Sequence, residues 1–126
     1  MTTTTTNTAA AIPSEVSDLM DDLTGFHPAL DRAVAALGDL ITADLTTDES
    51  MCIVAALGGL ADGSFRTLVG MAVREIGNPD TNPALAGLPA DRQQTLRRLG
   101  AEHVAAVDDR HLDDTAAEMA AVIERA

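Results

Sequence analysis

Aromatic residues, cysteine and lysine are scarce in this 126-residue sequence, which contains two Phe, one Cys and no Trp, Tyr or Lys. The single cysteine, Cys52, excludes an internal disulfide and a thiolate metal cluster. The shortage of aromatics removes the stacking platforms that bind single-stranded nucleic acid and the side chains that most often anchor protein interfaces. We therefore do not expect strong binding of single strands.

Long apolar runs are also missing, because no segment approaches the roughly 20 apolar residues that a membrane-spanning helix needs. Residues 1–11 are rich in Thr and Ala and have neither the basic nor the apolar region of a signal peptide. We therefore predict a cytoplasmic protein without membrane contact. Residues 1–12 are expected to form a disordered Thr-rich tail, and residues 13–126 a single helical domain.

Apolar residues recur at helical spacing through most of the chain, and Ala, the best helix former, supplies 23 residues. Glycines and capping residues divide the pattern into predicted helices over 14–24, 28–45, 47–62 and 64–76; the third begins with a capped N-terminus at Thr46-Thr47-Asp48-Glu49, and Ser64 is the predicted N-cap of the fourth. A long loop follows over 78–88, and the last third forms two helical stripes with a break at 108–111. The prediction is an all-α fold, a compact bundle of five or six helices.

The segment 47–62 carries no charge between Ser50 and Ala61 and is apolar on all sides. Such a helix is normally buried on all sides, so we expect it to form the centre of the bundle together with the helix 64–76. Cys52 would then be a small core residue. The pair Gly58-Gly59 is expected to permit close packing of helices.

The net charge of −12 is unevenly distributed. Residues 1–63 have a net charge of −9 and residues 99–126 one of −5, whereas residues 64–98 have a net charge of +2. An acidic chain is in general repelled by nucleic acid and by anionic membranes. If a partner binds, we expect it on the arginine-bearing segment, where the candidate binding residues are Arg66, Arg74, Arg92, Arg97 and Arg98.

Catalytic motifs are missing from the sequence, which has no Gly-rich phosphate loop, nucleophile elbow, HExxH or CxxC. We therefore expect no cofactor, and an enzyme is the class with the least support. The leading hypothesis is a non-enzymatic interaction or regulatory protein that acts through helix faces on a protein partner. Because surplus apolar stripes of helix bundles are commonly buried by pairing, a homodimer is also expected.

Two alternatives stay open. The helices 47–62 and 64–76, joined at Gly63, fit a helix-turn-helix DNA-binding regulator whose arginines contact DNA, although the second helix has few polar side chains for reading bases. The weaker alternative is a small-ligand or metal-binding protein that uses His103 and an acidic cluster. The candidate metal ligands are Asp108, Asp109, His111 and Asp113. The carboxylates equally suit a solvated turn and a helix cap, and His103 suits a core or interface position.

Overall fold

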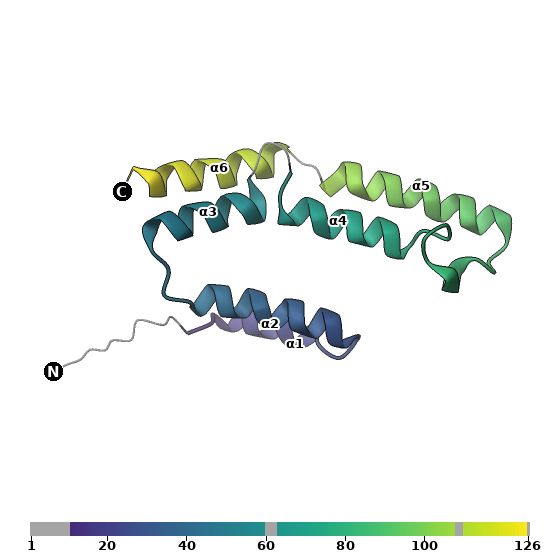
Figure 1. The fold of residues 1–126 in the computed structure, drawn as a ribbon, viewed down its shortest axis with the longest axis horizontal. Helices are drawn as coiled ribbons and strands as arrows, with labels where there is room; N and C mark the ends of the chain where they lie inside the picture. The colour runs from purple at the N-terminus through teal and green to yellow at the C-terminus, as the bar shows by residue number, and fades with distance from the viewer. Residues whose placement is uncertain (1–10, 60–62, 108–109, 126) are drawn as a thin grey trace. The chain divides into compact units, whose positions relative to one another are not determined.

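The structure, a computed structural model, describes residues 11–59, 63–107 and 110–125, with the side chains of 110–113 outside the description. These residues form six α-helices, one short 3₁₀ helix and no strand (Figure 1), which confirms the predicted all-α class and number of helices. The elements are α1 (Ser14–Asp22), α2 (Pro28–Thr42), α3 (Thr47–Gly58), α4 (Phe65–Ile76), η2 (Pro83–Leu85), α5 (Ala90–Val107) and α6 (Arg110–Glu124). Of the predicted tail, residues 1–10 lie outside the described residues.

The first of two units, up to Leu45, is the pair of helices α1 and α2. The chain turns between them at Gly25, whose φ of +102° is a left-handed conformation that favours glycine. The His27 side chain caps α2 by accepting a hydrogen bond from the Ala29 backbone N–H at 3.0 Å. This turn ends α1 slightly earlier than predicted.

The two helices of this unit pack closely at Gly38, where a Cβ atom would lie 2.7 Å from the Met20 Cε atom. Because each helix covers only one side of the other, much of their apolar surface stays exposed, including Leu19 and Ile41. A groove of about 170 Å³ runs between the helices. Its lining is entirely apolar and consists of Val16, Leu19, Met20, Leu23, Val34, Leu37 and Ile41.

The second unit, from Thr46 onwards, begins with the capped helix N-terminus that the sequence predicts. The Thr46 Oγ1 atom accepts a hydrogen bond from the Glu49 backbone N–H at 3.1 Å, and the Glu49 carboxylate accepts one from the Thr46 backbone N–H at 3.0 Å. This reciprocal capping box starts α3. The bond from the Thr46 backbone also holds the pKa of Glu49 below its ordinary value.

Two helix pairs make up this unit: α3 packs against α6, and α4 packs against α5 (Figure 1). The helices of each pair run in opposite directions (Figure 1); in the second pair, Gly70 of α4 faces Val107 of α5, and the later residue Arg74 faces the earlier residue Gly100. A Cβ atom at Gly58 would lie 3.2 Å from the Ala116 Cβ atom. A Cβ atom at Gly59 would lie 2.8 Å from the same Ala116 Cβ atom. The expectation that Gly58 and Gly59 permit close packing is therefore confirmed.

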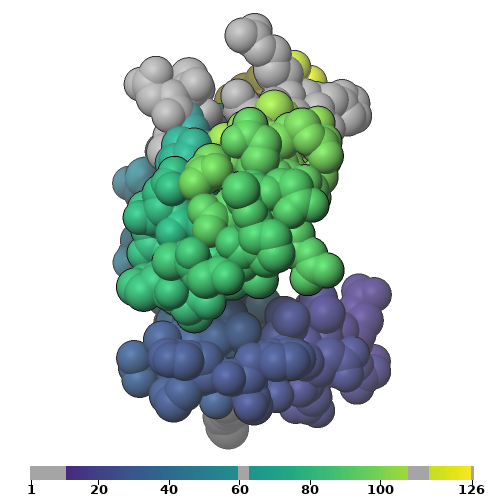
Figure 2. All heavy atoms as spheres, turned by 90° about the vertical axis from the view of Figure 1, so that its right-hand side faces the viewer, coloured from purple at the N-terminus to yellow at the C-terminus, as the bar shows by residue number. Residues whose placement is uncertain are grey.

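The long loop between α4 and α5 is held by side chains that bond to backbone. Thr81 and Asn82 donate hydrogen bonds to the carbonyl oxygens of Glu75 and Ile76, at 2.6 and 2.8 Å, and so fix the loop to the end of α4. Gln93 of α5 donates to two loop carbonyls, at 2.8 and 2.9 Å. In Figure 2, which faces this end of the unit, the green atoms of the loop and α5 lie closely together.

The prediction that the third helix is buried on all sides is wrong. None of the α3 residues is buried, and Cys52 is exposed instead of lying in a core, because α6 covers only one side of α3. Residues 60–62, which the prediction added to this helix, lie outside the described residues. At the predicted break, α5 ends at Val107 and α6 begins at Arg110, and residues 108–109 also lie outside the description.

Candidate functional site

Of the five candidate arginines, Arg97 forms an ion pair with two hydrogen bonds to the same carboxylate. Its Nε atom donates to Asp80 Oδ2 at 3.0 Å and its Nη2 atom to Asp80 Oδ1 at 2.8 Å, so that α5 is tied to the loop before it. The hydrogen bonds from Arg97 lower the pKa of Asp80, and those same bonds raise the pKa of Arg97. Both groups are therefore charged and paired at neutral pH.

The other arginines are spread over the surface of the second unit. Arg74 Nε donates to the Glu75 carboxylate at 2.8 Å, and Arg98 Nη1 donates to Glu102 at 3.2 Å. Arg92 is exposed, and Arg66 is half-buried. At about 100° per residue, the three arginines of α5 point to three different sides of that helix. The three arginines of α5 therefore do not lie on one side of that helix.

The metal-site candidates fall largely outside the description. Asp108 and Asp109 are not among the described residues, and nothing is described of the side chains of His111 and Asp113. Within the described part of the chain, no three His, Cys, Asp or Glu residues come together as a metal site would require. Of the core or interface position expected for His103, its exposure on α5 excludes the core position.

A different feature dominates the second unit, namely that the large apolar side chains of α4 are all exposed. Their exposed fractions lie between 40% and 67%. We call this set the α4 face; it consists of Phe65, Leu68, Val69, Met71, Val73 and Ile76. The sequence predicts most of these residues as one helical stripe, and the helix is strongly amphipathic, but the stripe is not a core.

The α4 face is open because α4 packs on α5 with its other side. Gly70 is the buried residue of α4, and a Cβ atom there would lie 3.1 Å from Val107 Cγ1. One turn later, Arg74 passes beside Gly100 of α5, where a Cβ atom would lie 3.1 Å from Arg74 Cγ. The contact between the helices therefore uses glycine and an arginine stem, and it leaves the apolar side of α4 uncovered.

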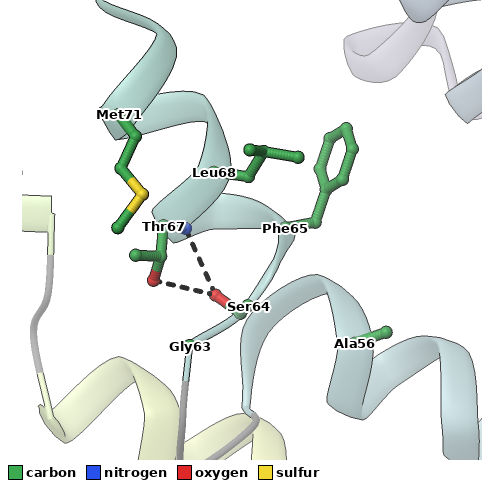
Figure 3. Close-up of a pocket in the computed structure, with 7 residues that line it drawn as sticks. All are labelled: Ala56, Gly63, Ser64, Phe65, Thr67, Leu68 and Met71. Carbon is green, nitrogen blue, oxygen red and sulfur yellow. Dashed lines mark hydrogen bonds between the residues drawn. The ribbon is translucent and has the colours of Figure 1, made fainter. Parts of the chain in front are cut away.

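A hollow of about 430 Å³ lies at the N-terminal end of the α4 face. Ser64 caps the helix there, accepting from the Thr67 backbone N–H at 3.4 Å (Figure 3), which confirms its predicted N-cap position. In Figure 3 the side chains of Phe65 and Leu68 extend from α4 side by side. The hollow is lined by Ala56, Gly63, Ser64, Phe65, Thr67, Leu68 and Met71.

Sequence reasoning missed this surface because a helical stripe of apolar residues predicts burial but does not say what covers it. The signal that could have revealed it is the pair Gly70 and Gly100. Glycine inside a helix is unfavourable, so it indicates a close approach of another element. In α4 that approach is on the side opposite the stripe.

Comparison of the chain with protein-family models, curated proteins and solved structures gave no match. None of the helices within the described residues is long and apolar enough to cross a bilayer. The α4 face is therefore the feature of this chain that bears most directly on its function.

Proposed function

We propose that this chain is a non-enzymatic interaction or regulatory protein of the cytoplasm, which binds a protein partner through the α4 face. The observation that carries the proposal is that six large apolar side chains of one helix are each at least 40% exposed. Single apolar residues are normal on protein surfaces, whereas contiguous patches of them mark interaction sites.

The free energy available from the α4 face sets the strength of such a complex. Fully burying one side chain of this size contributes about 1.5–3 kcal/mol, so covering the exposed half of six of them contributes roughly 5–9 kcal/mol. Association itself costs on the order of 4–15 kcal/mol. The α4 face alone therefore supports a weak complex, and tighter binding needs polar contacts at its rim.

The shape and chemistry of the face favour a helical partner. The six residues carry no charge, and the 12-residue helix extends over about 18 Å, which suits an amphipathic helix laid along it. A helix that reads DNA presents polar side chains to base edges. The open side of α4 presents aliphatic side chains and Phe65 instead, which favours protein over DNA as the partner.

Capture experiments with matched variants test the proposal. Full-length protein, Leu68→Gln and Val122→Gln would each be immobilised and incubated with extract of the source cells. Leu68 and Val122 are similarly exposed, at 58% and 59%, but Val122 lies on α6, away from the α4 face. We expect a protein that is retained by the wild type and by Val122→Gln and lost with Leu68→Gln. Equal recovery on all three would contradict the proposal.

A further inference from the structure

We infer that the partner on the α4 face is a second copy of this chain, with the two α4 helices antiparallel and Ile76 of each copy seated in the hollow of the other. This inference rests on the proposed function, because it names the partner for the same surface. Three observations point to it: the charge of the segment, the complementarity of the two ends of α4, and the area of the face.

Charge is the first consideration for any self-association of this chain. Two copies with a net charge of −12 each repel one another over most of their surface. In a two-fold interface each patch meets its own copy, so a charged patch always meets the same sign. The α4 face is uncharged and lies in the segment 64–98, the one part of the chain with a small positive net charge. Repulsion between copies is therefore least at this face.

The two ends of α4 complement each other. Ile76, at the C-terminal end, is the most exposed large side chain of the helix, at 67%, and the hollow lies at the N-terminal end. An antiparallel pair of 12-residue helices places each Ile76 over the partner's Phe65 and Leu68, which line that hollow. This orientation also sets the positive end of each helix dipole beside the negative end of the other. A parallel pair would leave both hollows empty.

The exposed area agrees with a small, reversible dimer. With roughly 100 Å² of apolar surface per large side chain, six half-exposed residues offer about 300 Å² per copy, or about 600 Å² for the pair. Specific interfaces at the lower end bury about 1,200 Å² in total, of which some 57–65% is apolar. The α4 face supplies most of that apolar area. We therefore expect a dissociation constant of the dimer in the micromolar to millimolar range.

Sedimentation equilibrium of the full chain between about 1 μM and 1 mM tests the self-association. Wild type and Val122→Glu should show a monomer–dimer equilibrium, and Ile76→Glu should weaken dimerisation by tenfold or more. Added salt should strengthen the wild-type dimer, because it screens the repulsion between two acidic copies. A dimer that weakens with salt would indicate a charge-driven contact elsewhere, and would overturn the inference.

Cysteine cross-linking tests the antiparallel orientation. In a Cys52→Ser background, the double variant Phe65→Cys, Ile76→Cys should form disulfide-linked dimers on oxidation. Ile76→Cys alone should not, because its two copies would lie at opposite ends of the pair, beyond the reach of a disulfide. Efficient linking through Ile76→Cys alone would mean a parallel pair and would contradict the geometry.

The outcomes separate this inference from the proposed function. A chain that stays monomeric up to 1 mM overturns the inference, yet the proposed function stands if capture of another protein still depends on Leu68. If capture does not depend on Leu68 either, both fail. If the retained protein in that capture experiment is the chain itself, both are supported.

Discussion

Both helix pairs of the second unit pack through glycines, but one pair covers the apolar side of its helix and the other leaves that side exposed. In both, glycines let the helices approach closely: Gly58 and Gly59 meet α6, and Gly70 meets α5. Against α6, the small residues lie on an apolar side, and Ala120 is buried there. Against α5, they lie on the polar side of α4, so that the apolar side is left open.

In these two pairs the glycines lie on the covered side of the helix, whether or not its large apolar residues lie on that side as well. Tight contacts at glycine gain dispersion energy from backbone atoms and need no large side chain. The large residues of α4 are then available to a partner. The α3–α6 pair therefore covers its apolar side within the unit, whereas the α4–α5 pair leaves exposed the apolar surface that we propose as a binding site.

The largest effect is expected from Gly59→Ala in the α3–α6 pair. The new Cβ atom would lie 2.7 Å from the Ala117 backbone nitrogen, which cannot yield as a side chain can, so the helices must separate. We expect a loss of about 3 kcal/mol in the free energy of unfolding, measured with urea. Gly87→Ala is the control, because a Cβ atom there has open space around it. Equal midpoints for the two variants would contradict the close packing.

The second largest effect is expected from a polar substitution in the α3–α6 pair, compared with one on the α4 face. Ala120→Gln places a long polar side chain in the buried side of α6, where Ala120 is 8% exposed, and should cost about 2 kcal/mol. Leu68→Gln should change the free energy of unfolding of the monomer by less than about 0.5 kcal/mol, because the site is exposed. Urea unfolding at micromolar concentration compares them. A larger loss for Leu68→Gln would mean that the α4 face is part of the core.

Gly70→Ala should lower the free energy of unfolding by less than Gly59→Ala does. The Cβ atom would lie 3.1 Å from Val107 Cγ1, a side-chain atom that yields more easily than backbone. Alanine also gains about 1 kcal/mol over glycine inside a helix, which offsets most of the strain. A Val107→Ala background removes the contacts with both Cγ atoms and leaves the contact with the residue 107 Cβ atom at 3.2 Å, so Gly70→Ala should be less destabilising there than in the wild type, by up to about 1 kcal/mol. A double-mutant cycle that shows no coupling would place Val107 away from Gly70.

The smallest effect is expected at the Asp80–Arg97 pair, which is solvent-exposed. Because the pKa of Asp80 is lower in the folded chain than its ordinary 3.8, the pair stabilises the fold above that pH, and the stabilisation is lost as the pH falls through the lowered pKa. The free energy of unfolding of Asp80→Asn should therefore fall less than that of the wild type between about pH 5 and about pH 2. An NMR titration that finds the Asp80 pKa at or above 3.8 would contradict the ion pair.

Much of the fold could be predicted from the sequence, because it depends on local signals. The Thr46–Glu49 capping box and the Ser64 cap mark helix starts, and the periodicity of apolar residues gives the all-α class. The early end of α2 at Thr42 was not predictable, because apolar residues continue to Leu45 while the backbone turns extended at Ala43.

The candidate site could be predicted only in part. The charge distribution predicts a partner on the segment 64–98, to which α4 belongs, but it indicates the arginines of that segment and not its apolar side chains. Three of those arginines bond to acids in the same unit, and pairs such as Asp80 with Arg97, 17 residues apart, depend on how the loop folds. Which side of α4 is covered likewise depends on its contacts with Val107 and Gly100 of α5. The periodicity of the α4 sequence carries no information about these residues.

NOE measurements on monomeric protein at low concentration can show whether α4 meets α5 through Gly70 and keeps its apolar side open. Cross-peaks are predicted between the Gly70 α-protons and the Val107 methyl groups, with none from the Val69 or Ile76 methyl groups to α5. Cross-peaks from Val69 or Ile76 to α5 side chains, without the Gly70–Val107 contact, would show that the apolar side is the covered one and would contradict this packing of α4.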